Sequence, residues 1–170
     1  MAMNATRRSF LRSAPVAAAG FAFGEGVLLP AAEAQTAASV PFQVFPAEKI
    51  AEDIKALAVK PGNNNLFDNP ALPFTVVLTT ETAHSAKEFE WHEGRDHILQ
   101  VIEGSTVYEI GGKPEGAHSS KPSEWNAPSA AGATKMTLRK GDMLVIPRNT
   151  LHKRSTEGSV TFYLISTTGK

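Results

Sequence analysis

Four side chains of this sequence have the types and the spacing of metal ligands. Glu90, His92 and His97 fall within one stretch of eight residues, and His152 follows later in the chain. Side chains two positions apart on a β-strand point to the same face, so we expect Glu90 and His92 side by side. A return of the chain across the turn at residues 93–94 would bring His97 next to them. Imidazoles and a carboxylate that converge in this way can bind a divalent ion.

Other interpretations of these residues stay open at the level of sequence. A single strand histidine is more often a surface group or a hydrogen-bonded core group than a ligand. Only the set of three makes an ion site the preferred hypothesis. Glu90 could be a fourth ligand, a neighbour of the ligands or a catalytic carboxylate. His84 and His118 fit no such pattern, so we interpret both as surface histidines.

Strands rather than helices are predicted to hold these residues. Short runs rich in β-branched and aromatic residues alternate with turns, which is typical of a β-sandwich or β-barrel. The predicted strands cover residues 74–80, 88–92, 97–102, 105–110, 135–139, 142–147 and 159–167. A single helix is predicted at residues 46–59, because Ile50, Ile54 and Leu57 share one face and residues 60–65 form a helix stop.

Residues 113–134 interrupt this rhythm. They are rich in Gly, Pro, Ser and Ala, and Trp125 is isolated among them. A stretch of this length without predicted elements is either a functional lid or an irregular surface loop without a function, and we favour the surface loop. Arg95, Asp96 and Arg148 lie in predicted turns beside the candidate ligands, and we expect them to be solvated.

The first 34 residues have the layout of an exported bacterial precursor. Arg7 and Arg8 precede a soft apolar stretch at residues 14–29, and Ala32 and Ala34 form a small-x-small cleavage pattern. The paired arginines predict the twin-arginine route, hence a periplasmic or secreted protein. The alternative is a disordered basic N-terminus. The apolar stretch is too short and too rich in Gly for a membrane span, so we expect no stable span after cleavage.

Charge and composition exclude some classes of partner. Removal of the predicted signal peptide takes away three arginines and two glutamates, so the net charge falls from zero to near −1. Nucleic acid is therefore not an expected partner, because binding to phosphates needs clustered Lys and Arg. The chain has no cysteine, so neither a disulfide nor a thiolate ligand is available.

A segment around His152 resembles the second motif of the cupin superfamily. Gly141, Pro147 and His152 match three positions of that motif in residue type and spacing. Asn149 replaces a glycine, which is tolerable because asparagine also accepts a positive φ. Thr156 replaces the final asparagine of the motif.

The first cupin motif is matched mainly in its spacing. Counting back from Gly104 puts His97 at the glutamate of the family motif, His92 at its second histidine and Glu90 at its first. The glutamate and one histidine have exchanged positions relative to the family motif, but the set of three histidines and one glutamate is the same. The resemblance covers roughly residues 74–167.

This resemblance implies a fold, a cofactor and a division of the chain. The implied fold class is all-β, a single cupin or jelly-roll β-barrel with one short N-terminal helix. Residues 1–34 would be the signal peptide, 35–72 a strand, helix and linker packed on the barrel, and 73–170 the barrel itself. The cofactor would be one divalent metal ion held by Glu90, His92, His97 and His152, and this donor set suits Fe, Mn, Ni, Zn or Cu.

Three further polar side chains are candidates for binding a substrate. Arg154 lies two residues after the last histidine and should face the interior, where it could clamp a carboxylate. Alternatively, Arg154 pairs with a carboxylate of the barrel such as Glu90 or Glu109. Gln100 and Tyr108 are polar residues in otherwise apolar strands, and they either line the cavity or lie on the outer face.

The function expected from these features is that of an exported metal-dependent enzyme. Its chemistry would be of the oxygenase, isomerase or lyase type, on a small oxygen-rich or carboxylate-bearing molecule. One alternative is a non-catalytic module that binds a small molecule or a metal, and another is a structural barrel with an incidental metal. Phe89 and Trp91, predicted to point outward, would suit a homodimer interface or packing of the predicted helix.

Overall fold

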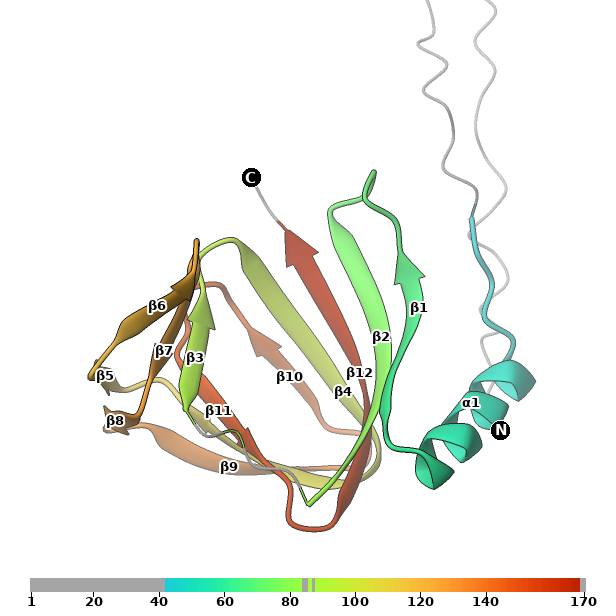
Figure 1. Ribbon diagram of the computed structural model, residues 1–170. Helices are drawn as coiled ribbons and strands as arrows, with labels where there is room; N and C mark the ends of the chain where they lie inside the picture. The colour runs from blue at the N-terminus through green and yellow to red at the C-terminus, as the bar shows by residue number, and fades with distance from the viewer. Residues whose placement is uncertain (1–41, 84–85, 87, 169–170) are drawn as a thin grey trace, which may run out of the picture. The chain divides into compact units, whose positions relative to one another are not determined.

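The computed structural model describes residues 42–83, 86 and 88–168 (Figure 1). The predicted signal peptide at residues 1–34 and His84 lie outside these residues. The described residues from Gln43 onward belong to one unit, which contains the helix and the strands described below. No helix among the described residues has the length and hydropathy needed to cross a membrane.

The predicted all-β architecture with one short helix is confirmed. Helix α1 (Ala47–Val59) follows Pro46, and Leu57 is its buried residue. It is followed by twelve strands, β1 (Gly62–Asp68), β2 (Phe74–Thr82), β3 (Phe89–His92), β4 (Arg95–Ile110), β5 (Lys113–Glu115), β6 (His118–Lys121), β7 (Glu124–Ala127), β8 (Ser129–Ala131), β9 (Thr134–Arg139), β10 (Met143–Ile146), β11 (His152–Ser155) and β12 (Ser159–Thr168).

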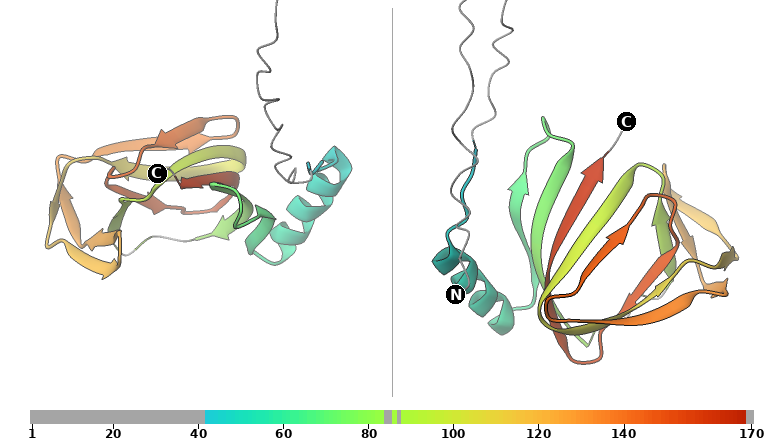
Figure 2. Two further views of the ribbon diagram at one scale, coloured as in Figure 1. Left: turned by 90° about the horizontal axis from the view of Figure 1, so that it is seen from above. Right: turned by 180° about the vertical axis from the view of Figure 1, so that it is seen from behind.

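Ten strands form one antiparallel sheet that folds into two halves, as in a jelly roll. In the first half, β1, β2, β12, β4 and β10 lie in that order. In the second half, the order is β9, β4, β11, β3, β7 and β6. Figure 2 shows the two ends of this arrangement, with α1 and β1 at one end and β5 to β8 at the other. The predicted jelly roll is confirmed, but its sheet is not closed into a barrel, because the outer strands β1 and β6 each pair with a single neighbour.

Strand β4 belongs to both halves, and Gly104 is where it passes from one to the other. Up to Gly104 it pairs with β12, and from Ser105 onward it pairs with β9. The φ angle of Gly104 is 74°, and the register of β12 shifts opposite this point. The sequence predicted a turn here that separates two strands. The chain instead continues as one bent strand, because a glycine with positive φ can bend a strand without ending its pairing.

Replacing Gly104 by alanine should destabilise the protein by about 2 kcal/mol or more. The added Cβ would overlap the backbone carbonyl oxygen of Ser159, and the positive φ disfavours any side chain. Urea unfolding measures the loss. Gly94→Ala is the matched control, because nothing lies within 4 Å of its added Cβ. Equal stability of the two variants would contradict the role given to Gly104.

The core lies between the two halves of the sheet. Leu99 and Val101 alternate with outward residues along β4 and are almost completely buried. They belong to a cluster with Tyr108, Leu138, Ile146, Val160 and Phe162. Since His97 lies two residues before Leu99, it shares this inward face, as the alternation predicted.

The prediction that residues 113–134 form an irregular surface loop is wrong. They form strands β5 to β8, and β7 pairs with β3 along its whole length. Phe89 is consequently buried against Ala127 and Leu151, and Trp91 stacks on Trp125 with ring centroids 5.7 Å apart. These aromatic side chains are thus covered by this segment rather than turned toward the helix. Strands of three or four residues among Gly, Pro and Ser carry too short a pattern to be predicted.

Candidate metal centre

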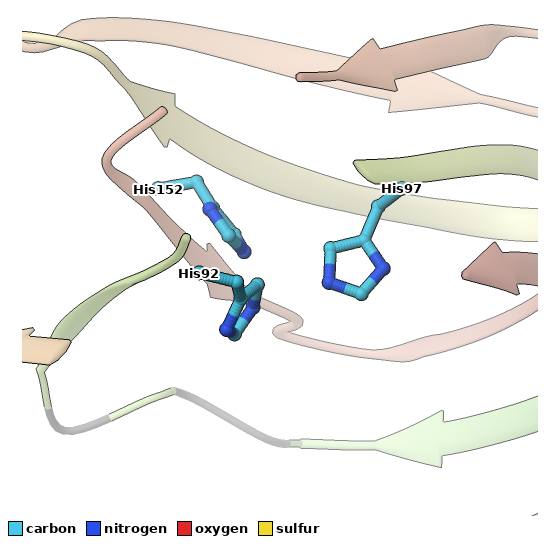
Figure 3. A group of neighbouring side chains, drawn as sticks. All are labelled: His92, His97 and His152. Carbon is cyan, nitrogen blue, oxygen red and sulfur yellow. The ribbon is translucent and has the colours of Figure 1, made fainter. Parts of the chain in front are cut away.

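Three histidines from three strands converge on one point. His92 ends β3, His97 lies near the start of β4 and His152 begins β11. Their side chains are buried, and their potential ligand atoms all lie within 4.8 Å of one another. The ring centroids are 4.9, 5.4 and 5.9 Å apart. Figure 3 shows the three rings turned toward the same space.

Strand geometry accounts for this convergence. His152 pairs with both Ile110 of β4 and Glu90 of β3, so β11 bridges these two strands. The turn before β11 contains Asn149 with a φ of 63°, which confirms the predicted positive φ. The backbone N–H of Asn149 also donates to the carbonyl of His92 at 2.7 Å and so ties this turn to the end of β3.

Each of the three rings is held in place through its Nδ1 atom. Acceptors or hydroxyls lie within 2.9 Å of these nitrogens: Glu124 Oε2 at 2.5 Å from His92, Ser166 Oγ at 2.9 Å from His97, and the carbonyl of Thr150 at 2.9 Å from His152. A carboxylate and a carbonyl can only accept, so the Nδ1 atoms of His92 and His152 carry the proton. The Nε2 atom is therefore the one that these rings can offer to a metal ion, the arrangement typical of ligating histidines.

Arg95 and Glu124, which hold the His92 ring in place, were not identified in this role from the sequence. Arg95 and the Nδ1–H of His92 both donate to the same oxygen of Glu124, at 2.8 and 2.5 Å. The expectation that Arg95 is a solvated turn residue is wrong, since it helps to hold this carboxylate. Glu124 begins β7, inside residues 113–134, which were interpreted as an irregular surface loop. No spacing in the sequence connects it with His92.

Replacing Glu124 by glutamine should weaken metal binding by about 10- to 100-fold. The amide keeps the size of the side chain but removes the charge that fixes and polarises the His92 ring. Competition with a coloured chelator measures the affinity. Glu115→Gln is the matched control in the same segment, because Glu115 only accepts a surface hydrogen bond from Ser129. The role of Glu124 would be contradicted if both variants bound the metal as tightly as the unaltered protein.

Glu90 lies beside the histidines at the rim of the site. Its Oε1 is 3.5 Å from the Nε2 of His152, and 52% of its side chain is exposed. The hydrogen bond that a protonated Nε2 of His152 donates lowers the pKa of Glu90 to about 2, and Glu90 is a carboxylate at neutral pH in either form of His152. Glu90 is not part of the group whose ligand atoms lie within 4.8 Å of one another, so its role as ligand, neighbour or catalytic group stays a prediction.

Burial keeps His92 and His97 neutral at ordinary pH. Burial and the neighbouring His92 lower the pKa of His97 to about 4, and burial is also the main cause of the lowered pKa of His92. A neutral imidazole has a lone pair ready for a metal ion, so little competition from protons is expected near pH 7.

The metal-free protein should lose stability as the pH falls from about 6.5 to 4. In this window the unfolded chain binds a proton at His97 and the folded chain does not, so acid favours unfolding by roughly 3 kcal/mol. Denaturant unfolding at a series of pH values in the presence of a chelator measures this slope. The slope should be shallower in His97→Gln, and an identical slope in both proteins would contradict the assignment.

Arg154 faces the interior, as predicted, but its partner is neither Glu90 nor Glu109. Its Nε donates to Glu81 Oε2 at 3.0 Å, and its Nη2 donates to the other oxygen of Glu81. Its Nη1 donates to the hydroxyl of Tyr108 at 3.0 Å. The guanidinium therefore already holds a carboxylate, which Glu81 of β2 supplies.

Tyr108 and Gln100, the two other candidates, lie in different places. Tyr108 is buried in the core with its hydroxyl at the site, and burial raises its pKa. Gln100 lies on the opposite face of β4, where it lines an apolar cavity of about 300 Å³ together with Ile50 of α1. The structure thus brings Arg154 and Tyr108 to the histidines but not Gln100.

Two adjoining cavities lie at the site. The inner cavity, of about 220 Å³, is lined by the three histidines and also by Ile146 and Leu164. The outer cavity, of about 290 Å³, is lined by Glu88 and Asn126. Both share the walls formed by Glu90, Tyr108, His152 and Arg154. A small molecule could thus reach the histidines while most of its surface contacts polar side chains.

Comparison with known proteins shows similarity only at the level of solved structures. No protein-family model and no curated protein matches the chain. A cupin-like protein from Thermotoga maritima is 21% identical, with 62% of this chain and 66% of that chain covered and a TM-score of 0.44. A cupin superfamily protein from Desulfitobacterium hafniense is 15% identical, with 65% and 79% covered and a TM-score of 0.46.

A third similar structure is a protein with a cupin-2 domain from Shewanella frigidimarina, 16% identical over 68% of this chain and 89% of that chain, with a TM-score of 0.44. For the Thermotoga protein, the match spans slightly less than two thirds of its length. Structural neighbours of this chain are therefore cupin proteins. Likeness at this level carries no information on activity, so the function has to be argued from the site.

Proposed function

We propose that this protein is an exported, metal-dependent enzyme of the cupin type that acts on a small, oxygen-rich molecule. One observation carries the proposal. Three buried histidines, each fixed through Nδ1, converge at the wall of a cavity that a small molecule can enter. Three protein ligands and an accessible space are typical of catalytic metal sites, whereas structural sites use four protein ligands and are closed.

The residues present fit a divalent ion of the Fe, Mn, Ni, Zn or Cu group. His92, His97 and His152 would hold it, and Glu90 lies close enough to His152 to join them. When bound, such an ion supplies Lewis acidity, which polarises an oxygen of the substrate or activates a water molecule.

The remaining side chains of the site would bind and orient the substrate. The hydroxyl of Tyr108 accepts a hydrogen bond from Arg154, so its own proton is available for a substrate oxygen. Glu90 would accept a hydrogen bond from a substrate hydroxyl. Ile146 and Leu164 would contact an apolar part of the substrate, because both line the same cavity.

A second candidate function is that of a non-catalytic module which binds a metal and a small molecule. The exposure of Glu90 favours this alternative, because a carboxylate whose side chain is 52% exposed is a weak general base near pH 7. Turnover would then have to depend on the bound ion rather than on this side chain.

Export and self-association complete the proposal. The sequence of residues 1–34 supports the twin-arginine route, which would let the chain fold around its metal ion before it crosses the membrane. A homodimer also remains part of the proposal. Size-exclusion chromatography with light scattering tests the dimer, and fractionation of cells that express the full chain tests export.

Turnover of small polyols, hydroxyketones and hydroxyacids by the metal-loaded protein tests the enzyme proposal. We expect a product with at least one of the ions named above, and loss of that product in the metal-free protein. Tyr108→Phe should lower the rate while leaving the metal content unchanged. Tight metal binding without any turnover would favour the non-catalytic module instead.

A further inference from the structure

We infer that the outer cavity selects a small molecule that donates hydrogen bonds and carries no negative charge. This inference rests on the proposed function, because it concerns the ligand of the same site. It departs from the expectation of a carboxylate-bearing substrate, which depended on Arg154 as a clamp.

Both arginines on the cavity walls are already paired with carboxylates. Arg154 donates a hydrogen bond to each oxygen of Glu81 and a third to the hydroxyl of Tyr108. Arg95 donates to Glu124 behind His92. A bidentate pair uses the side of the guanidinium that a substrate carboxylate would need. Binding such a substrate would thus require breaking a partly buried ion pair.

The carboxylates of the outer cavity, in contrast, have no such partners. Among the described residues, neither Glu88 nor Glu90 forms an ion pair with a lysine or an arginine. Glu88 lies 3.6 Å from the exposed His118, and Glu90 lies 3.5 Å from His152. Two carboxylates on one wall repel an anionic ligand, and they accept hydrogen bonds from hydroxyl or ammonium groups.

The other polar groups of the outer cavity point to the same chemistry. The amide nitrogen of Asn126 donates to the backbone carbonyl of Phe89, which leaves its side-chain oxygen as an acceptor for a ligand. Tyr108 can donate its hydroxyl proton to a ligand, because its oxygen already accepts a hydrogen bond from Arg154. A ligand that fits this cavity therefore needs several donors, as polyols and amino alcohols have.

Three molecules with the same three-carbon chain test the inference. They share one hydroxyl and differ at the other end: 3-aminopropan-1-ol, propane-1,3-diol and 3-hydroxypropanoate. Binding to the zinc-loaded protein is measured by ligand-observed NMR, and the zinc content of each sample is determined in parallel. We expect the amine to bind about tenfold more tightly than the carboxylate, with the diol between them.

Glu88→Gln is the decisive variant, because Glu88 is not one of the proposed metal ligands. It should reduce the preference for the amine over the carboxylate severalfold, while Glu103→Gln, on an exposed residue of β4, should leave it unchanged. A preference for the carboxylate, the same preference in the Glu88 variant, or binding of none of the three would overturn the inference. Each of these outcomes with stoichiometric zinc leaves the metal site standing, whereas absence of zinc would count against the proposed function itself.

Discussion

Replacing His152 by alanine is expected to abolish stoichiometric metal binding. The loss should exceed about 100-fold in affinity, because removal of a ligand costs more than removal of its hydrogen-bonding partner. His152 is buried, its Nδ1 is fixed by the carbonyl of Thr150, and its ring closes a triangle with the rings of His92 and His97. Two histidines alone would leave an ion mostly coordinated by water. Titration of the metal-free protein by calorimetry measures the effect.

The surface histidine His118 provides the matched control. Half of its side chain is exposed, and its nearest charged neighbour is Glu88 at 3.6 Å. His118→Ala should bind metal like the unaltered protein, and circular dichroism should show that both variants keep their strands. Metal binding by His152→Ala at unaltered affinity would remove this residue from the site.

Replacing Glu81 by alanine is expected to cost about 3 kcal/mol of stability. The side chains of Glu81 and Arg154 are only 17% and 23% exposed, so the variant would leave the guanidinium largely buried without its carboxylate. The pair also joins β2 to β11, across the space between the two halves of the sheet. Urea unfolding of the metal-free protein measures the loss without a contribution from bound metal.

The double replacement Glu81→Leu with Arg154→Met distinguishes the contribution of the ion pair from the cost of leaving one buried charge unpaired. Apolar residues of similar volume often replace a buried ion pair with little loss, so the double variant should regain most of the stability. Asp53→Ala, which breaks an exposed pair with Lys49 on α1, should have little effect. A loss in Glu81→Ala no larger than that in Asp53→Ala would show that the ion pair contributes little.

Local patterns in the sequence were sufficient to predict much of the fold. Runs of β-branched and aromatic residues predicted most of β2, β4 and β12, and the spacing of Ile50, Ile54 and Leu57 predicted α1. Strand β1 was missed because three asparagines open it and resemble the end of a helix. Strand β1 is an edge strand that pairs with β2, and its Asn63 accepts a hydrogen bond from Thr79.

The candidate site was predictable where it depends on short spacing along the chain. The histidines at positions 92, 97 and 152 lie at strand ends that the sequence indicates, and the structure brings them together. Their supporting groups come from remote strands: Glu124 from β7 and Ser166 from β12. The partner of Arg154 likewise depends on which strand faces β11. Such pairings follow from sheet topology, which no local pattern specifies.

The proposed function depends on the binding of one divalent ion by His92, His97 and His152. Elemental analysis of the purified protein, before and after reloading a chelator-treated sample, tests it most directly. We expect close to one ion of Fe, Mn, Ni, Zn or Cu per chain, restored by reloading. A folded protein that contains no stoichiometric metal in either state would contradict it.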